Sequence, residues 1–240
     1  MVGKSQIKLI KSLQQKKVRS QQQLFVVEGR KTVEELINST IKTNKIYTTN
    51  EEFALAYSNI SELISSADLK KISSLATPNG YLGVFEIPKP KKINFDDWIL
   101  ALDFVQDPGN LGTIIRLCDW FGVRSLVCST DTVDCYNPKV LQATMGSISR
   151  INMVYVDLPE FLETTNLPIF GAFMEGEVVY KSNLPKKGIL VMGNEANGVS
   201  DKVLNVINQK ISIPQFGEKT TESLNVATAT AILLNEIRRA

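Results

Sequence analysis

Polar side chains gather at the start of the last apolar segment of the chain, in the sequence ISIPQFGEKTTESLNVATATAILLNEIRR. A long helical pattern from Leu224 predicts a buried helix. Thr221, Glu222, Ser223 and Asn225 bring hydroxyl, carboxylate and amide groups to its beginning. Ser223 alone could be an ordinary N-cap. These groups therefore indicate a functional site only if other chemistry-bearing segments join them.

A glycine-rich loop with the sequence GNEANG, residues 193–198, follows an apolar strand pattern at 188–192. Glycines on both sides of Asn194 and Glu195 permit a tight turn and let a ligand approach main-chain N–H and C=O groups. Glu195 could also be a solvated turn residue. Its position directly after a buried strand favours a site.

A third segment, WILALDFVQDPGNLGTIIRLCDWFGV, predicts a strand, a turn and an amphipathic helix that carries Arg116. Asn110 could cap this helix, and Arg116 could be a surface salt-bridge partner. We expect Asp103 and Asp107 to shape the turn. Polar residues at the carboxyl ends of strands meet in one crevice of an open parallel sheet. The three segments therefore predict a single site.

An alternation of strands and helices from Trp98 onward positions these loops. It predicts a mostly parallel sheet that is covered on both faces. The expected strands are 98–104, 125–129, 151–156, 168–173, 188–193 and 210–213, and the expected helices are 110–121, 138–148, 159–165, 200–208 and 224–238. We expect Trp98 and Trp120 to lie in the core.

The amino-terminal part predicts a second, smaller α/β unit without catalytic features. It begins with a basic amphipathic helix over 4–17, followed by expected strands at 24–27, 45–48, 62–64 and 81–87 and expected helices at 29–37, 51–57 and 67–75. Prolines and lysines interrupt the pattern between Glu86 and Asp97, as in a linker. The expected domains are 1–90 and 98–240, joined by a linker at 91–97.

Composition narrows the classes of function. The chain has 240 residues, 43% of them hydrophobic, which suffices for a globular core. It has no signal-peptide pattern and no apolar run long enough for a bilayer, so we expect a cytoplasmic protein without membrane contact. Three cysteines without C-x-x-C spacing indicate reduced thiols and no metal site. The absence of histidine excludes Ser–His triads and His-based zinc sites.

The net charge of +2 is unevenly distributed. Residues 1–31 carry eight basic residues and one acidic residue, a net +7, so the rest of the chain carries −5. A basic arm on a mildly acidic body favours a polyanionic partner such as nucleic acid. A solvated helix face would also explain this charge.

Taken together, DFVQDPGNLGTIIR, LVMGNEANGVS and IPQFGEKTTESLNVATATAILLNE resemble the three signature motifs of the SPOUT superfamily. They are most similar to those of its SpoU-type (TrmH-like) RNA ribose 2′-O-methyltransferases, and the match covers the whole carboxyl-terminal domain. The amino-terminal stretch FVVEGRKTVEELI resembles the ribosomal-protein-like substrate-binding domain that often precedes this catalytic domain. The order and spacing of three motifs make the resemblance specific.

The resemblance implies an α/β fold with a carboxyl-terminal trefoil knot, S-adenosylmethionine as cofactor, and a homodimer formed through the carboxyl-terminal domain. Matching each motif position assigns catalytic roles to Asn110, Arg116, Glu195, Ser223 and Asn225. The same matching assigns cofactor contacts to Met192, Gly193, Asn194, Ile213, Pro214, Ser223 and Leu224. No metal is implied. The loop before Ser223 is longer than usual, so Glu218–Thr221 have no clear counterpart, and Ala227 stands where the family often has serine.

The implied reaction is methyl transfer to a ribose hydroxyl, in which alignment supplies much of the rate. A guanidinium stays protonated, so we expect Arg116 to grip a phosphate and steady the oxygen as its proton leaves to a phosphate, water or Glu195. Ribosomal RNA is the expected substrate. The alternatives are a tRNA ribose methyltransferase and an RNA-binding ribosome-assembly factor without activity. A Rossmann oxidoreductase is disfavoured, since no G-x-G-x-x-G follows the first strand.

Overall fold

The computed structural model describes residues 2–218 and 223–239, which form two compact units. The first consists of Met1–Lys89 and Tyr136–Ser149, and the second of Pro90–Cys135 and Arg150–Ala240. The segment Tyr136–Ser149 therefore packs with the amino-terminal unit although it lies inside the range 98–240. The assignment of RNA recognition and catalysis to separate ranges stays a prediction.

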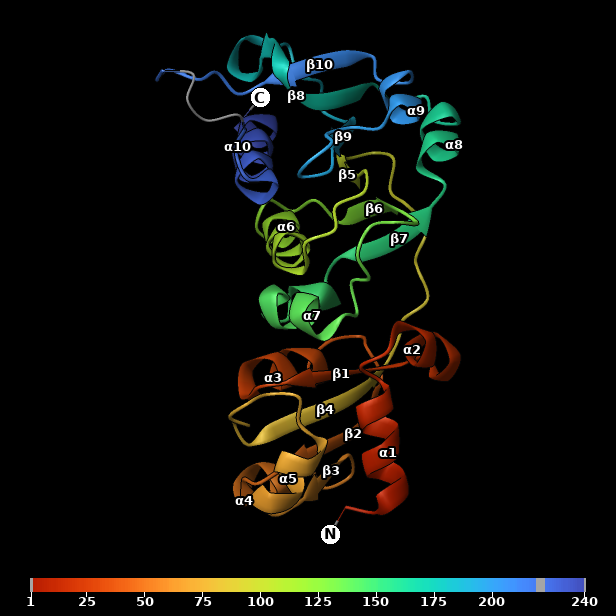
Figure 1. Ribbon diagram of the computed structural model, residues 1–240, viewed down its shortest axis with the longest axis vertical. Helices are drawn as coiled ribbons and strands as arrows, with labels where there is room; N and C mark the ends of the chain where they lie inside the picture. The colour runs from red at the N-terminus through yellow and green to blue at the C-terminus, as the bar shows by residue number, and fades with distance from the viewer. Residues whose placement is uncertain (1, 219–222, 240) are drawn as a thin grey trace. The chain divides into compact units, whose positions relative to one another are not determined.

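The first unit is built on a four-stranded sheet with the order β1-β4-β2-β3 (Figure 1). Strand β4 is antiparallel to β1 and β2, while β3 is parallel to β2. The strands are β1 (Leu24–Glu28), β2 (Thr43–Thr48), β3 (Ser61–Leu63) and β4 (Tyr81–Glu86). The helices are α1 (Lys4–Ser12), α2 (Lys16–Gln22), α3 (Arg30–Ile37), α4 (Glu51–Ala56), α5 (Ser66–Ile72) and α7 (Pro138–Thr144), followed by a 3₁₀ turn, η1 (Ser147–Ser149).

Alternate residues of the strands serve the two faces of this sheet. Val26 and Leu82 belong to a core cluster that also contains Ile10 of α1 and Leu69 of α5. Phe25, the neighbour of Val26, faces the opposite way and lies 4.8 Å, between ring centroids, from Tyr136. The returning segment thus completes the second core of the unit.

The amino-terminal helix expected over 4–17 is two helices, α1 and α2. Arg19 explains the break, since its buried guanidinium donates from Nη1 to the carbonyl oxygens of Leu13 and Gln14, at 2.8 Å each. These carbonyls lie at the end of α1, where helical partners are missing. The side chain of α2 therefore supplies the hydrogen bonds that a continuous helix would have made.

The second unit is built on a six-stranded sheet with the order β10-β8-β9-β5-β6-β7, in which every pair of neighbours is parallel. The strands are β5 (Ile99–Leu102), β6 (Ser125–Ser129), β7 (Asn152–Val156), β8 (Ile169–Val178), β9 (Ile189–Met192) and β10 (Gln209–Ser212). The helices are α6 (Pro108–Trp120), α8 (Leu158–Glu163), α9 (Asp201–Leu204) and α10 (Val226–Arg239), with a 3₁₀ turn, η2 (Val179–Lys181).

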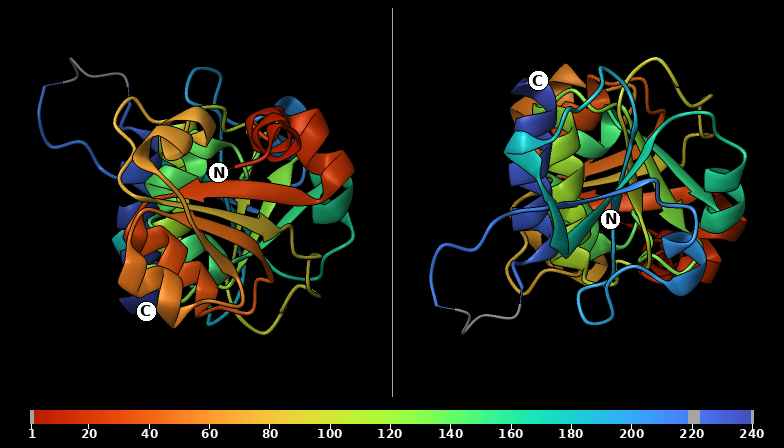
Figure 2. Two further views of the ribbon diagram at one scale, coloured as in Figure 1. Left: turned by 90° about the horizontal axis from the view of Figure 1, so that it is seen from below. Right: turned by 90° about the horizontal axis from the view of Figure 1, so that it is seen from above.

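Helices cover both faces of this sheet: α6 and α10 lie on one face, and α8 and α9 on the other (Figures 1 and 2). Strands β5, β6 and β9 are buried at every residue, as strands between two helical layers must be. The expected α/β fold with a parallel sheet is confirmed. Among the described residues, no helix is long and apolar enough to cross a membrane.

The two tryptophans differ in solvent exposure. Trp98 is buried, with 2% of its surface exposed, as expected. The expectation for Trp120 is wrong, since 84% of its surface is exposed. It belongs to the outward stripe of α6 formed by Gly109, Thr113, Arg116 and Trp120, which recur at the three- and four-residue spacing of one helix face.

Candidate functional site

The loop from β5 to α6 is held by its two aspartates, as expected. Asp107 caps α6, since its Oδ1 accepts a hydrogen bond of 2.7 Å from the N–H of Asn110. Buried Asp103 accepts one of 2.7 Å from the N–H of Ser200. Because Asp107 supplies the cap, the side-chain amide of Asn110 is available for other partners.

The glycine-rich loop after β9 closes on itself. Asn194 and Gly198 exchange two main-chain hydrogen bonds of 2.8 and 3.0 Å, and Oδ1 of Asn194 accepts from the N–H groups of Ala196 and Asn197 at 2.9 Å each. A Cβ on Gly193 would lie only 2.4 Å from the carbonyl carbon of Gly198. The loop therefore requires glycine at 193 for its own closure, and only small atoms fit there.

The first two loops are bonded to each other. Nδ2 of Asn194 donates to the main-chain oxygen of Phe104 at 2.7 Å. The carboxylate of Glu195 accepts from Nδ2 of Asn110 at 2.9 Å and from the N–H groups of Gln106 and Asp107 at 3.3 Å each. Glu195 is therefore a clamp on the start of α6.

The third segment joins them through Asn225, which caps α10. Its Oδ1 accepts from the N–H groups of Ala227 and Thr228 at 2.9 and 3.2 Å. Its Nδ2 donates to Oδ1 of Asn110 at 2.8 Å. A chain of hydrogen bonds thus runs from Asn225 through both ends of the Asn110 amide to Glu195. Segments separated by more than 80 residues meet at this one amide.

These loops border a cavity of about 1050 Å³. All seven residues expected to contact the cofactor line it: Met192, Gly193, Asn194, Ile213, Pro214, Ser223 and Leu224. Glu195 and Asn225 line it too, whereas Asn110 and Arg116 are not among the lining residues. Residues 219–222, which include Thr221, Glu222 and most of the long loop noted in the sequence, lie outside the described residues.

Sequence reasoning missed one wall of the cavity, which is formed by Ala172, Phe173, Met174 and Glu175 of β8. The pairing of β8 with β10 jumps there: Lys210 pairs with Gly171, but Ile211 pairs with Glu177. The skipped residues bulge and form the wall. Gly176 in an otherwise strand-like run was the available signal, because a Cβ there would lie only 2.7 Å from the main-chain oxygen of Lys210.

Arg116 does not join the hydrogen-bonded group. It lies six residues after Asn110 on α6, which places it about 9 Å further along the helix and about 120° around it. The side chain is exposed, and within the part of the chain that the structure describes it has neither a hydrogen-bond nor an ion-pair partner. One chain therefore assembles Asn110, Glu195 and Asn225 but leaves Arg116 facing outward.

The cysteines lie away from this chemistry. Cys118, Cys128 and Cys135 are buried and form no disulfide. Burial raises the pKa of the Cys118 and Cys128 thiols, which disfavours the reactive thiolate. Among the described residues, no cluster of acidic or cysteine side chains could hold a metal ion.

Residues 97–235 match the model of the SpoU rRNA Methylase family, and residues 4–83 match the model of the MRM3-like substrate binding domain. The chain belongs to the SpoU rRNA Methylase family. Among curated relatives of this SpoU methylase, the Bacillus subtilis 23S rRNA (guanosine(2553)-2'-O)-methyltransferase RlmP is 31% identical over 239 residues, which covers 95% of this chain and 94% of the relative. The 23S rRNA (guanosine-2'-O-)-methyltransferase RlmB of Neisseria meningitidis is 31% identical over 77% of this chain and 78% of the relative.

Two solved structures match the SpoU methylase along its whole length. A putative RNA methyltransferase of the TrmH family from Porphyromonas gingivalis superposes with a TM-score of 0.89 and 36% identity, covering 100% of this chain and 99% of that one. An AdoMet-bound rRNA methyltransferase from Sinorhizobium meliloti superposes with a TM-score of 0.87 and 27% identity, covering 100% and 97%. The two units described here thus occur together in both structures.

Proposed function

We propose that this SpoU methylase transfers a methyl group from S-adenosylmethionine to the 2′-hydroxyl of a ribose in RNA, with 23S ribosomal RNA as the substrate. The meeting of three separated segments at Asn110, beside the cavity, carries the proposal. The relatives support it, since RlmP and RlmB are named as 23S rRNA 2′-O-methyltransferases.

The residues around the cavity suit the cofactor. Its volume of about 1050 Å³ accommodates a nucleoside with a side chain, and its lining mixes apolar side chains such as Met192 and Leu224 with a glycine loop. When bound, the cofactor supplies a methyl group activated on a sulfonium. Main-chain groups near Gly193 and Ile213 would hold the adenosine without side-chain bulk. The proposed contacts are those expected from the motifs.

The hydrogen-bonded chain would act by alignment. Asn225 and Glu195 fix the amide of Asn110, and Glu195 also fixes the start of α6. A rigid border of this kind holds the acceptor ribose in line with the methyl group, where positioning supplies much of the rate. The carboxylate of Glu195, water or an RNA phosphate would take up the hydroxyl proton.

A homodimer formed through the second unit would place Arg116 where it can contact RNA bound at the partner subunit. The outward stripe of α6 contains Trp120, and α10 has an outward stripe with the same spacing: Thr228, Ile232, Asn235 and Arg239. Exposed apolar residues on two packed helices are typical of an interface. Arg116 lies one turn from Trp120, so in a dimer it would face the partner and grip the phosphate beside the target nucleotide there.

Three further features complete the proposal. The match of residues 97–235 to the SpoU model supports the carboxyl-terminal trefoil knot that the motifs imply. The amino-terminal unit would be a ribosomal-protein-like RNA-binding domain. The protein would work in the cytoplasm, where its ribosomal substrate is made.

The decisive experiment incubates the protein with labelled S-adenosylmethionine and 23S rRNA transcribed without modifications. We expect one ribose to become methylated, mapped by its resistance to alkaline cleavage. Transfer to unmodified tRNA instead would establish the tRNA alternative. Binding of the cofactor without transfer to either RNA would favour the inactive assembly factor, and absence of cofactor binding would refute the proposal.

A further inference from the structure

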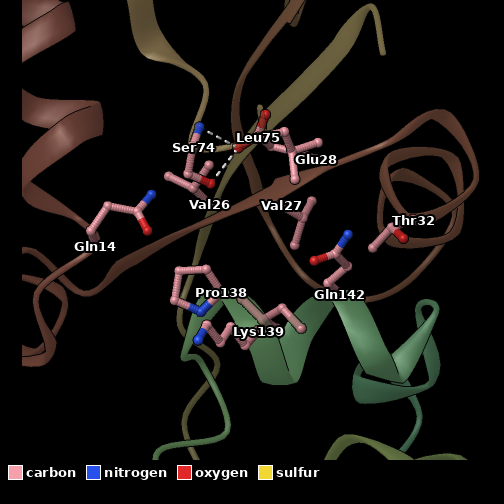
Figure 3. A pocket seen from close by; sticks show the side chains of 11 residues that line it. Gln14, Val26, Val27, Glu28, Thr32, Ser74, Leu75, Pro138, Lys139 and Gln142 are labelled. Carbon is pink, nitrogen blue, oxygen red and sulfur yellow. Dashed lines mark hydrogen bonds between the residues drawn. The ribbon is translucent and has the colours of Figure 1, made fainter. Parts of the chain in front are cut away.

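The first unit contains a cavity of about 260 Å³ that the proposed reaction does not use. Val26, Val27 and Glu28 of β1 lie on one side of it, and Pro138, Lys139 and Gln142 of α7 lie on the other (Figure 3). Gln14, Thr32, Ser74, Leu75 and Leu141 complete the lining. The cavity therefore combines apolar walls with a polar edge dominated by one carboxylate.

Glu28 is held in a fixed orientation. Its Oε1 accepts from the N–H of Ser74 at 2.8 Å and from Oγ of Ser74 at 2.7 Å, while its Oε2 accepts from Oγ of Ser73. Among the described residues no cation pairs with it. A carboxylate can accept about four hydrogen bonds, so Oε2 keeps an open acceptor position. The Glu28 carboxylate is thus held in place, carries no paired cation among the described residues and lies beside a cavity, so it favours a ligand that donates an N–H group.

We propose that this cavity binds one unpaired nucleobase of the RNA, and that Glu28 selects a base with an exocyclic amino group. This inference rests on the proposed function, since it assumes an RNA substrate. An amino group of guanine, adenine or cytosine donates to Oε2, while the apolar walls of Val27, Leu75 and Pro138 contact the faces of the ring. Uracil is disfavoured because its only ring donor lies between two carbonyl oxygens, which the carboxylate repels.

The charges around the cavity favour a base over a phosphate. The carboxylate of Glu28 repels a phosphate from the interior. Exposed cations lie at the edge and beside it in sequence: Lys139 lines the cavity, and Lys11, Lys16 and Lys17 flank Gln14 in the chain. Phosphate contacts position a nucleic acid, and base contacts give the specificity. The amides of Gln14 and Gln142 can serve the remaining polar atoms of the base.

The test uses the full-length protein and fluorescein-labelled single-stranded RNA hexamers. One hexamer is all uridine, and three others carry a single central G, A or C. Fluorescence anisotropy at constant salt gives the ratio of affinities between each amino-bearing hexamer and the all-uridine one. We expect a preference of about tenfold for the best base in the native protein, as one charged hydrogen bond supplies.

Glu28→Gln should reduce that ratio to near one, because the amide places its NH₂ or a weaker acceptor at the same position. Glu51→Gln, an exposed glutamate of α4 away from the cavity, makes the same charge change and should keep the ratio. A general gain in RNA affinity from the lost charge cancels in the ratio. Gln142→Phe is the second variant: it narrows the cavity from the exposed side of α7 without touching the partners of Glu28, and should also remove the preference.

A native ratio near one, or an unchanged ratio in both Glu28→Gln and Gln142→Phe, would overturn this inference. Calorimetry with S-adenosylmethionine alone separates it from the proposed function. Cofactor binding without a base preference rejects only the base site, while loss of cofactor binding in the native protein rejects the proposed function.

Discussion

Replacing Asn110 by aspartate should break the hydrogen bond between Asn110 and Glu195 while keeping the shape of the side chain and the Oδ1 that accepts from Asn225. The variant loses the Nδ2 donor that lies 2.9 Å from Glu195 and places a carboxylate there instead. The lost hydrogen bond to a charged acceptor is worth about 1.5 kcal/mol, at the lower end for such bonds because Glu195 is exposed. Two like charges about 3 Å apart add about 1.4 kcal/mol even in water. The sum of about 3 kcal/mol predicts a loss of about 100-fold in kcat/KM.

The pH dependence of the defect makes this prediction specific. When two carboxylates share a site, one of them retains a proton and donates an O–H to the other. The variant therefore regains a donor at acidic pH, and the ratio of native to Asn110→Asp activity should shrink as pH falls from 8 to 6. Asn94→Asp is the matched control, since exposed Asn94 bonds, among the described residues, through its Oδ1 alone, which aspartate keeps. A defect of equal size at every pH would refute the role of the Asn110–Glu195 bond.

Gly193→Ala should weaken S-adenosylmethionine binding by about tenfold or more in calorimetry, because its Cβ would lie 2.4 Å from main-chain carbon. Gly217→Ala, where no atom of the described residues lies within 4 Å of the added Cβ, should bind normally, and equal affinities of the two variants would contradict the loop argument. Trp120→Glu should convert a dimer into monomers in sedimentation velocity, whereas Leu55→Glu, 77% exposed in the first unit, should not; a native monomer would remove the dimer proposal. The Arg238 guanidinium holds the pKa of Asp97 below its usual value through hydrogen bonds of 2.7 and 3.0 Å. The pair therefore stabilises the fold at pH values above the pKa of Asp97 in the unfolded chain. This contribution is lost as the pH falls through the lower pKa of Asp97 in the folded protein. Arg238→Ala should therefore lower the free energy of unfolding, measured in urea, by about 1–2 kcal/mol at pH 7 and by much less near pH 3. Arg239→Ala is the control. An equal loss at both pH values would contradict the prediction.

The sequence predicted the second unit well because its strands are short, apolar and separated by helices. Buried runs such as Ile99–Leu102 can only be central strands, and the loops after them must meet at one edge of a parallel sheet. The polar residues on those loops could thus be assigned to one site from the sequence alone. Which atoms bond could not be predicted: Asn110 and Ser223 were the possible helix caps in the sequence, and the caps are Asp107 and Asn225.

Two features could not be predicted from the sequence, for the same reason. Trp120 is apolar and the segment Tyr136–Ser149 is periodic, and such patterns favour burial without showing against which element. Trp120 faces outward from its own unit, and α7 packs on β1, more than 100 residues away. A hydrophobic pattern does not show which distant strand a helix packs on, and it does not distinguish a buried tryptophan from one that faces away from its own unit.

The absence of histidine affects how the hydrogen bonds at the centre of the site respond to pH. The side-chain donors of the links between the three segments are the amides of Asn110, Asn194 and Asn225, and amides do not titrate near neutral pH. A histidine at any of these positions would change its hydrogen bonds between pH 6 and 8, and the loops would separate in part of that range. A reaction that depends on the alignment of two reactants gains from hydrogen-bond donors whose protonation does not change over this range. The geometry built around Asn110 therefore suits a transferase that aligns two reactants through donors that keep their protons.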